Sequence, residues 1–293
     1  MSTNASTFTA NAFEVGVAVA DFDIPDENLE YLKYEVDNIT FGLPTGYING
    51  LLPSNNATDA NNDIDIAVGK CRDDSDTVDI VLETAITKQL DAAFAEGTNA
   101  GGLNTGTKAN NTWYDLYIIA KADGTTDVMF STYANRETLP TDFVYKRYIG
   151  AIRTDASGNI RQGKWNIQSG GSLRFIYNTP IQDYIGGVPT TASLVTLTSP
   201  SSKASLVTHL LRTEATGVNQ GPAYTLLTNP DQADVAPSSS IFTNASDNFD
   251  LTDVSVVSVD VLTNDSSQIR YRGTKAVANS QILTRGYIDE RTV

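Results

Sequence analysis

Residues 166–293 alternate between short runs of β-branched and aromatic residues and clusters of Pro, Gly, Asn, Asp and Ser. This alternation is typical of antiparallel sheets, because strands favour β-branched and aromatic residues whereas turns need residues that tolerate unusual backbone angles. The strands predicted in this region are 173–177, 194–198, 206–211, 223–227, 254–262, 269–272 and 282–288. Their number and spacing predict a module that is a β-sandwich or resembles a jelly roll.

Residues 37–165 are expected to form another β-rich module, which differs from the module at residues 166–293 in containing one α-helix. Period-two alternation and turn signals predict strands at 114–120, 128–132 and 143–152. A helix is predicted at about residues 81–96, because apolar residues recur at every fourth position there. These residues are Leu82, Ile86, Leu90 and Phe94, followed by Gly97 at the position of a C-terminal cap. The predicted fold class is therefore mainly β, with two β-rich modules.

Residues 1–36 are interpreted as an extended N-terminal attachment arm with one strand at 13–19. Such an arm gains its order from a partner or a neighbouring subunit, and a frayed terminus is the alternative. The first residues lack the basic start and apolar core of a signal peptide, so folding in a cytosol is expected. No apolar run approaches the ~20 residues of a membrane helix, so membrane insertion is not expected.

The composition excludes several classes of function. One cysteine cannot form an intrachain disulfide, and one cysteine with one histidine cannot supply the usual zinc, haem or iron–sulfur ligands. The chain carries 20 Lys and Arg against 35 Asp and Glu, a net charge of −15. Nucleic-acid binders and proteins that bind anionic membranes need a basic surface, so neither partner is expected.

Candidate nucleophiles and phosphate-binding segments are weak, and we predict no catalytic residue and no cofactor. His209 lies inside an apolar strand, and Cys71 has no partner base nearby in the sequence. Residues 101–108 approach a phosphate-binding loop, but the order Gly-Thr-Lys is wrong, and the segment leads into a strand rather than a helix. The many carboxylates leave a paired-carboxylate hydrolase open.

Two acidic groups are candidate calcium sites, and no metal site is predicted from either. Asp59, Asn61 and Asp63 match the first half of a calcium loop, but Ile64 replaces the required glycine and the twelfth position lacks Glu. The second group is interpreted as a solvated loop, with a calcium ion between strands as the alternative; it comprises Asp73, Asp74 and Asp76.

Recognition of a partner is expected from polar loops, although no individual receptor-binding residue is predicted. The loops at 54–62 and 97–111 are the best candidates, because polar loops on rigid sheets commonly carry recognition surfaces. Aromatic residues beside predicted loops can stack on sugars or anchor protein contacts, with packing as the simpler explanation. They are Trp113, Tyr133, Trp165 and Tyr184.

Several segments of the sequence are distinctive enough to suggest a relationship. The first is GYINGLLPSNNATDANNDIDIAVG at residues 46–69, and the second is AITKQLDAAFAEG at 85–97, continued by GGLNTG at 101–106. YKRYIGAI at 145–152 and GYIDER at 286–291 follow. Over most of residues 45–293 the chain therefore resembles tail-fibre-like and other virion proteins of tailed bacteriophages. These segments contain no catalytic motif.

The resemblance implies β-rich modules at the distal end of a virion appendage, commonly homotrimeric, which contact the host surface. The chain would be assembled into the virion in the host cytoplasm, with residues 1–36 attached to other tail or capsid proteins. The family commonly has a long shaft before these modules, whereas only the short arm precedes them here. We expect a tail-fibre or receptor-binding component that acts by multivalent adhesion and has no enzymatic activity. The alternatives are a capsid decoration or head-fibre protein and a surface-glycan depolymerase.

Overall fold

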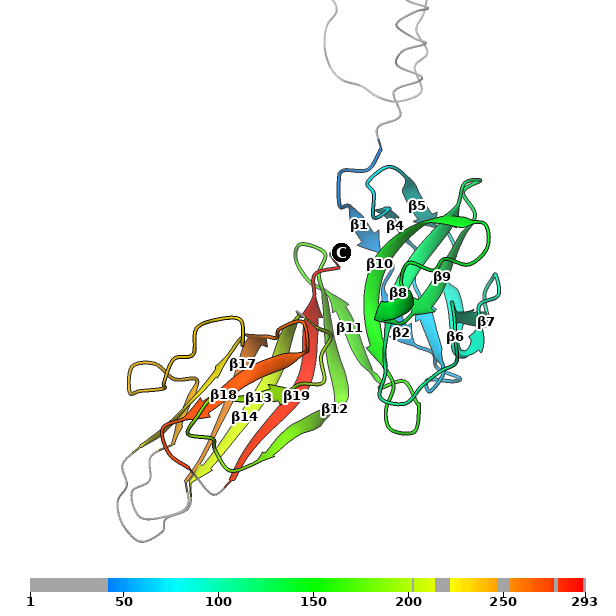
Figure 1. Cartoon of the computed structure of the whole chain (residues 1–293). Coiled ribbons are helices and arrows are strands. Elements are labelled where there is room, and N and C mark those ends of the chain that lie inside the picture. Colours follow the sequence, from blue (N-terminus) through cyan, green and yellow to red (C-terminus); the bar gives the residue numbers. More distant parts are fainter. Residues whose placement is uncertain (1–41, 202, 214–221, 247–252, 277–278, 292–293) are drawn as a thin grey trace, which may run out of the picture. The chain divides into compact units, whose positions relative to one another are not determined.

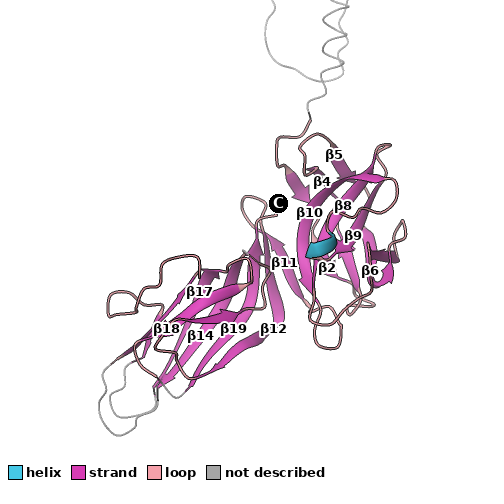
Figure 2. Cartoon of the chain, viewed as in Figure 1, coloured by secondary structure: helices cyan, strands magenta, loops and turns pink. Residues whose placement is uncertain are grey.

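The described residues form β-sheets almost throughout (Figures 1 and 2). The structure is a computed structural model that describes residues 42–201, 203–213, 222–246, 253–276 and 279–291. Within these ranges the only helix is the single 3₁₀ turn Tyr133–Asn135, so no helix there is long and apolar enough to cross a membrane. The predicted arm at 1–36, with its strand at 13–19, lies outside the described residues.

The first half of the described chain forms two sheets. The smaller has the order β1 (Ile48–Gly50), β4 (Gly69–Arg72), β5 (Asp79–Leu82). The larger has the order β10 (Phe143–Arg153), β8 (Trp113–Lys121), β9 (Thr126–Ser131), β7 (Ala100–Leu103), β6 (Ile86–Ala93), β3 (Asp63–Ile66), β2 (Pro53–Asn55). Neighbouring strands are antiparallel except that β7 runs parallel to both β6 and β9.

The helix predicted at residues 81–96 is wrong, because this segment forms the end of β5 and the whole of β6. A spacing of four fits a strand as well as a helix, since side chains on a strand alternate and every fourth residue returns to the same face. Ile86 and Leu90 are buried on one face of β6, with Lys88 buried between them. Because a charged residue, Lys88, occupies the buried face, the alternation of apolar and polar residues that marks a strand cannot be seen in the sequence.

The second half forms a β-sandwich, which confirms the mainly β fold class. One sheet has the order β11 (Gly163–Ile167), β12 (Leu173–Gly186), β19 (Asn279–Asp289), β14 (Ala204–Thr213), β17 (Asp253–Leu262). The other has the order β13 (Ser193–Thr196), β18 (Gln268–Gly273), β15 (Ala223–Thr228), β16 (Asn244–Ser246). Each strand predicted for this region overlaps one of these strands. The sheets share an apolar core that includes Val207, Leu211, Ile269, Tyr271 and Ile282.

A separate apolar core joins the sheets of the first half to one edge of the five-stranded sheet. Leu116 and Phe130 contribute from the seven-stranded sheet, and Ile80 contributes from the three-stranded sheet. Trp165 of β11 and Tyr287 of β19 are buried in the same core. The module boundary predicted between residues 165 and 166 falls inside β11.

A long antiparallel ribbon separates the entry point of the described chain from the loops at its far end. Pairs Ile48–Cys71 and Gly50–Gly69 join β1 to β4, and the pair Asn55–Ile64 joins β2 to β3. The chain enters this ribbon beside Arg72, whose N–H donates to the carbonyl of Tyr47 at 2.8 Å. Residues 56–62 turn at the opposite end (Figure 1).

Candidate functional site

The two polar loops predicted as recognition surfaces contact each other at this far end. Nζ of Lys108 donates a hydrogen bond to Oδ1 of Asn62. The backbone N–H of Leu90 donates to the Asn62 carbonyl at 2.8 Å, which fixes the loop to β6. Each predicted segment is partly strand, because 54–62 includes the end of β2 and 97–111 includes β7. The loops proper are residues 56–62 and 104–112.

A third segment, the turn at residues 155–160, joins these two loops. The N–H of Asn111 donates to the carbonyl of Asp155 at 2.9 Å, and the N–H of Ile160 donates to the carbonyl of Asn61 at 2.9 Å. The sequence alone does not place this segment beside the two loops. We call residues 56–62, 104–112 and 155–160 the loop cluster.

Side chains within the loop cluster hold its backbone in place. Oδ1 of Asn56 accepts the N–H groups of Thr58 and Asp59 at 2.8 and 2.9 Å. Oδ1 of Asp155 accepts those of Ser157 and Asn159 at 2.8 and 2.9 Å. A loop fixed in this way loses little conformational entropy when it binds a partner.

The same local bonding occupies the first calcium candidate. Oδ1 of Asp59 accepts the N–H of Asn61 at 3.2 Å, and its Oδ2 accepts Nδ2 of Asn62 at 2.9 Å. Partial burial, followed by the charges of Asp59, Asp91 and Asp65, raises the pKa of Asp63. The carboxylate of Asp59 therefore serves the loop that carries it.

Asn104 fastens the segment after β9 to the loop cluster. Its Nδ2 lies 3.0 Å from Oγ of Ser131, 3.0 Å from the carbonyl of Asn135 and 2.9 Å from the carbonyl of Thr138. This one side chain therefore holds residues 131–138 beside the loop at 104–112. The sequence gives no sign of this contact, since Asn104 stands in a run of polar residues that reads as a loop.

Tyr133 is the exposed aromatic residue of the segment that Asn104 holds. Its side chain is 69% exposed, and the guanidinium of Arg136 lies 4.2 Å from its ring centre. Such a cation–π pair offers an apolar face beside hydrogen-bond donors. Polar ligands with an apolar face, such as sugar rings, fit this combination.

The other three predicted aromatic residues are packed within the protein. The Trp113 ring meets Tyr287 edge to face at 5.7 Å. Trp165 is buried, and Tyr184 donates a hydrogen bond to the carbonyl of Gly187 while its ring packs on that of Tyr271. Of the four candidates, Tyr133 has the surface that a partner can reach.

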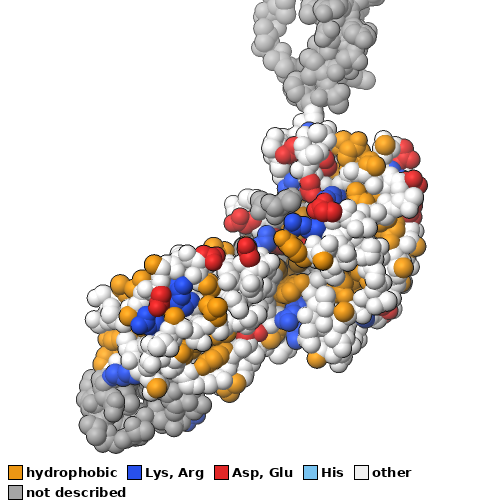
Figure 3. All heavy atoms as spheres, viewed as in Figure 1, with side chains coloured by type: hydrophobic (Ala, Val, Ile, Leu, Met, Phe, Trp, Pro, Cys, Tyr) orange, Lys and Arg blue, Asp and Glu red, His pale blue; other side chains and the backbone are white. Residues whose placement is uncertain are grey.

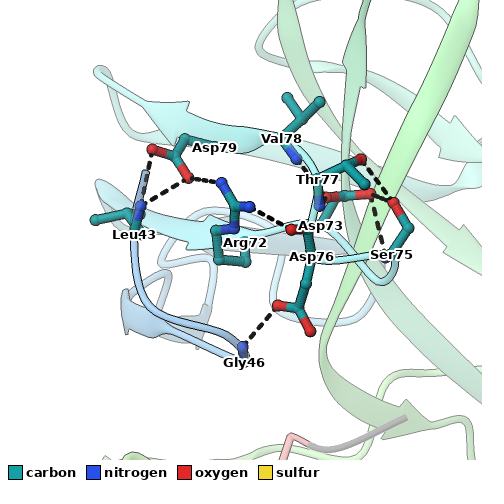
Figure 4. A network of polar contacts seen from close by, with 9 residues as sticks. All are labelled: Leu43, Gly46, Arg72, Asp73, Ser75, Asp76, Thr77, Val78 and Asp79. Carbon is teal, nitrogen blue, oxygen red and sulfur yellow. Dashed lines mark hydrogen bonds and ion pairs between the residues drawn. The ribbon is translucent and has the colours of Figure 1, made fainter. Parts of the chain in front are cut away.

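The second calcium candidate is a hairpin whose carboxylates bind its own backbone (Figure 4). Oδ1 of Asp73 accepts the N–H groups of Thr77 and Val78, both at 2.7 Å, and its Oδ2 accepts the N–H and hydroxyl of Ser75. Burial alone raises the pKa of Asp73, but hydrogen bonds from Ser75, Val78 and Thr77 outweigh it and lower the pKa below its ordinary value. Within the described residues, no group of three or more potential ligands is arranged to hold a metal.

This hairpin also holds the entry point of the described chain. Oδ1 of Asp76 accepts the N–H of Gly46 at 2.6 Å, and the carboxylate of Asp79 accepts the N–H of Leu43 at 3.2 Å (Figure 4). Arg72 pairs with Asp79 at 2.6 Å and donates to the carbonyl of Asp76. This network therefore fixes residues 43–46 to the hairpin.

A serine–histidine contact exists in the core of the sandwich but is closed to solvent. Nε2 of His209 lies 3.1 Å from Oγ of Ser280, which accepts the hydroxyl of Tyr271 at 2.6 Å. All three side chains are fully buried. Burial lowers the pKa of His209 to about 4, so the imidazole is neutral at physiological pH. No substrate can reach this serine in the described conformation.

Cys71 is also buried, at 0% exposure on β4. Burial raises the pKa of its thiol to about 12, despite the opposing charge of Arg147. The reactive thiolate is therefore scarce, and the side chain packs as an apolar group of the first core.

A pair of acidic residues, Asp115 on β8 and Asp289 on β19, lies where the two halves meet. Burial and then the charge of Asp289 raise the pKa of Asp115 to about 6. Asp289 is fully buried, accepts the hydroxyl of Tyr148 and pairs with Lys203 at 3.0 Å. A glycosidase needs its carboxylates open to a groove, whereas Asp289 is enclosed by protein groups.

Charges of both signs are interspersed on the surface. On the face drawn in Figure 3, Lys and Arg side chains lie among Asp and Glu and are separated by uncharged groups. Nucleic-acid recognition uses a continuous basic stripe or patch, which this face does not present.

In comparisons with known proteins, no family model and no curated protein matches this chain. Its function is therefore inferred from its own residues and their arrangement.

Proposed function

We propose that the chain is a structural subunit of a bacteriophage virion, a tail-fibre or receptor-binding component that adheres to the host surface. The observation that carries this proposal is the separation of two features along one ribbon. The N-terminal segment enters beside the Asp73–Asp79 hairpin, and the loop cluster lies at the opposite end. A subunit held on the hairpin side of this ribbon would present the loop cluster on the opposite side.

The loop cluster and Tyr133 supply the contacts expected of an adhesive surface. Asn and Thr side chains offer amide and hydroxyl groups, and the Tyr133–Arg136 pair offers an exposed aromatic face. Each contact is weak, but several copies on one particle bind tightly because the second and later contacts are effectively intramolecular. Adhesion of this kind needs no bond-making chemistry, so the proposal includes no enzymatic step.

A homotrimer is part of the proposal, with the outer face of the five-stranded sheet as its interface. Strand register places Ile185 and Val256 in one row across four strands, and these side chains are 60% and 58% exposed. Val254 and Leu262 on β17 are also about half exposed, at 50% and 52%. β17 stands at the edge of its sheet and contains neither Pro nor Lys, the residues that commonly protect an edge. A second copy of the chain would cover this surface.

The decisive experiment locates the protein on purified particles by cryo-electron microscopy with a labelled antibody. Density on the tail supports the receptor-binding proposal, and density on the capsid replaces it with the head-fibre alternative. Particles without the label contradict both. Incubation of the full chain with host surface polysaccharide is the companion assay, since release of oligosaccharide would favour the depolymerase alternative.

Recognition itself is tested with the full chain and intact host cells. Tyr133→Ala should reduce cell binding by roughly fivefold or more, because truncating an aromatic anchor at the centre of an interface costs more than about 1 kcal/mol. Phe242→Ala is the matched control, since Phe242 is another exposed aromatic residue, at 47%, on the sandwich. Equal binding by the two variants would contradict the assignment of the loop-cluster end as the adhesive surface.

A further inference from the structure

Lys88 is a fully buried lysine in the middle of β6. Its side chain is 0% exposed and shares the inward face of the strand with Ile86 and Leu90. Lysine is rarely buried completely, because removing an ammonium from water costs several kcal/mol unless the charge is paired or neutralised. The function proposed above makes no use of this residue.

Its amine reaches across β7 to a carboxylate on β9. Nζ of Lys88 lies 3.1 Å from Oδ1 of Asp127, and the Asp127 side chain is 2% exposed. Gly102 of β7 leaves room for this crossing, since a Cβ there would lie 3.1 Å from Cβ of Lys88 and 2.8 Å from the Phe130 ring. A side chain at this position would therefore collide first with the Phe130 ring and also press on Lys88.

The amine is oriented by further protein groups. Nζ donates to the carbonyl of Ala95 at 2.7 Å and to that of Gly97 at 3.1 Å. The ring of Phe94 covers Nζ at 4.8 Å from its centre. Lys88 is therefore held in one position against Asp127, within an enclosure that excludes bulk water.

The carboxylate of Asp127 is held from the other side by backbone donors. Its Oδ2 accepts the N–H of Gly97 at 2.8 Å, and its Oδ1 accepts the N–H of Val128 at 2.6 Å. The two donors hold different oxygens, so the Gly97 N–H is the one placed to stabilise negative charge on Oδ2 during acyl transfer, while the Val128 N–H fixes the orientation of the carboxyl group.

We propose that Lys88 and Asp127 form an intramolecular isopeptide bond, an amide that joins β6 covalently to β9. One ammonium proton moves from Nζ to Oδ1, which leaves an amine beside a carboxylic acid. Nζ then attacks Cγ, a C–N bond forms, and negative charge develops on Oδ2 beside the Gly97 N–H. The Cγ–Oδ1 bond breaks, and Oδ1 leaves as water with its own proton and a second proton from Nζ. The product is a neutral amide with one N–H, and the step needs no oxidant or other reactant.

Physical conditions in the enclosure favour this reaction. Burial lowers the pKa of Lys88, although the charge and hydrogen bond of Asp127 oppose the shift, so the neutral amine is easier to reach than in water. Holding the reacting groups in contact gives an effective concentration of order 10⁵ M or more in well-oriented cases. The amide also removes two charges from an apolar site, where an ion pair is costly. The reaction would require the folded chain, because only folding brings these residues together.

Peptide mapping of the purified full chain tests the proposal directly. Trypsin cleaves after free lysine and arginine, so an unlinked chain gives the separate peptides 73–88, 89–108 and 122–136. A linked chain gives one branched species that joins peptide 73–108, uncut at Lys88, to peptide 122–136. Its mass is one water below the sum of the two. Recovery of the three separate peptides at their full masses from folded protein would overturn the proposal.

The same digest contains an internal control. Lys121 pairs with Glu96 at 2.6 Å, closer than Lys88 to Asp127, but the Glu96 side chain is 53% exposed. Because water reaches this pair, Lys121 and Glu96 should remain unlinked. Trypsin should then cut after Lys121 and so create the N-terminal end of peptide 122–136. Lys88→Arg keeps the positive charge but removes the reactive amine, and its peptide 122–136 should be recovered free. A link to peptide 122–136 that persists in Lys88→Arg would contradict the assignment of Lys88.

Discussion

The hydroxyl of Tyr287 on β19 donates a hydrogen bond to the carbonyl of Ala151 on β10, at 2.7 Å. The donor belongs to the five-stranded sheet and the acceptor to the seven-stranded sheet. The Tyr287 ring packs against Phe175 and Trp113, at 5.1 and 5.7 Å between ring centres, and is 1% exposed. One side chain therefore joins the two halves by both packing and a buried polar contact.

Tyr287→Phe should lower the free energy of unfolding by about 1–3 kcal/mol, because the ring stays while a buried carbonyl loses its donor. Urea unfolding followed by fluorescence measures the change as a lower midpoint with an unchanged slope. Tyr133→Phe is the control, since an exposed hydroxyl should matter by less than about 0.5 kcal/mol. An equal effect of the two substitutions would show that the Ala151 contact contributes nothing.

Asp115 should make the protein less stable at neutral than at mildly acidic pH. Burial and the charge of Asp289 raise its pKa to about 6, while Arg136 and Lys203 oppose the shift. A raised pKa in the folded state stabilises the protein below the unfolded pKa, and this contribution is lost as pH rises through about 6. Asp115→Asn should therefore be more stable than the parent at about pH 7, by at most on the order of 3 kcal/mol.

The measurement is urea unfolding of the parent and Asp115→Asn at about pH 4 and about pH 7. The difference between them should be small at the lower pH and should grow as pH rises. A constant difference at both pH values would contradict a raised pKa for Asp115.

The strands of the second half were predictable because packing and local preference agree there. Val207, His209 and Leu211 alternate inward on β14, and His209 fits because its imidazole is neutral and bonded to Ser280. The sequence of β6 wrongly predicts a helix. A strand pattern would need an apolar residue at each inward position, and Lys88 occupies one of them. Its partner Asp127 is distant in sequence, so no local pattern could reveal the exception.

The candidate site was predictable as a set of loops but not as one surface. The polar composition of residues 54–62 and 97–111 marks both as loops. Their contact through Asn62 and Lys108, however, depends on the ribbon in which β1 pairs with β4 and β2 pairs with β3. The role of Asn104 depends on the parallel pairing of β7 with β9, which brings its side chain to residues 131–138. Parallel strands are usually recognised in a sequence by the helix that connects them. No helix lies between β7 and β9, so nothing in the sequence indicates that these strands are neighbours.

Asn104→Ala should release the segment that carries Tyr133. Three acceptors lose their shared donor, so residues 132–138 should exchange their amide hydrogens faster, while the core strands β8 and β9 keep their protection. Hydrogen exchange followed by mass spectrometry measures this segment by segment. Asn110→Ala, a change in the same polar loop, is the control. Unchanged exchange at 132–138 would show that Asn104 does not hold the segment.

Val256→Lys should dissociate the proposed trimer, because the substitution places a cation at the end of the row that begins at Ile185, and the cation would lose its water once a neighbouring copy covers this face. Light scattering should report a mass of about three chains for the parent and 31.5 kDa, one chain, for the variant. Val144→Lys is the matched control, since Val144 is a 56% exposed valine on an edge strand of the other half and Val256 is 58% exposed. Loss of the trimer in both variants would indicate general destabilisation, whereas a trimer that survives only Val144→Lys would place the interface on the outer face of the five-stranded sheet. A parent of single-chain mass would remove the trimer from the proposal, and avidity would then have to come from the separate copies carried by one particle.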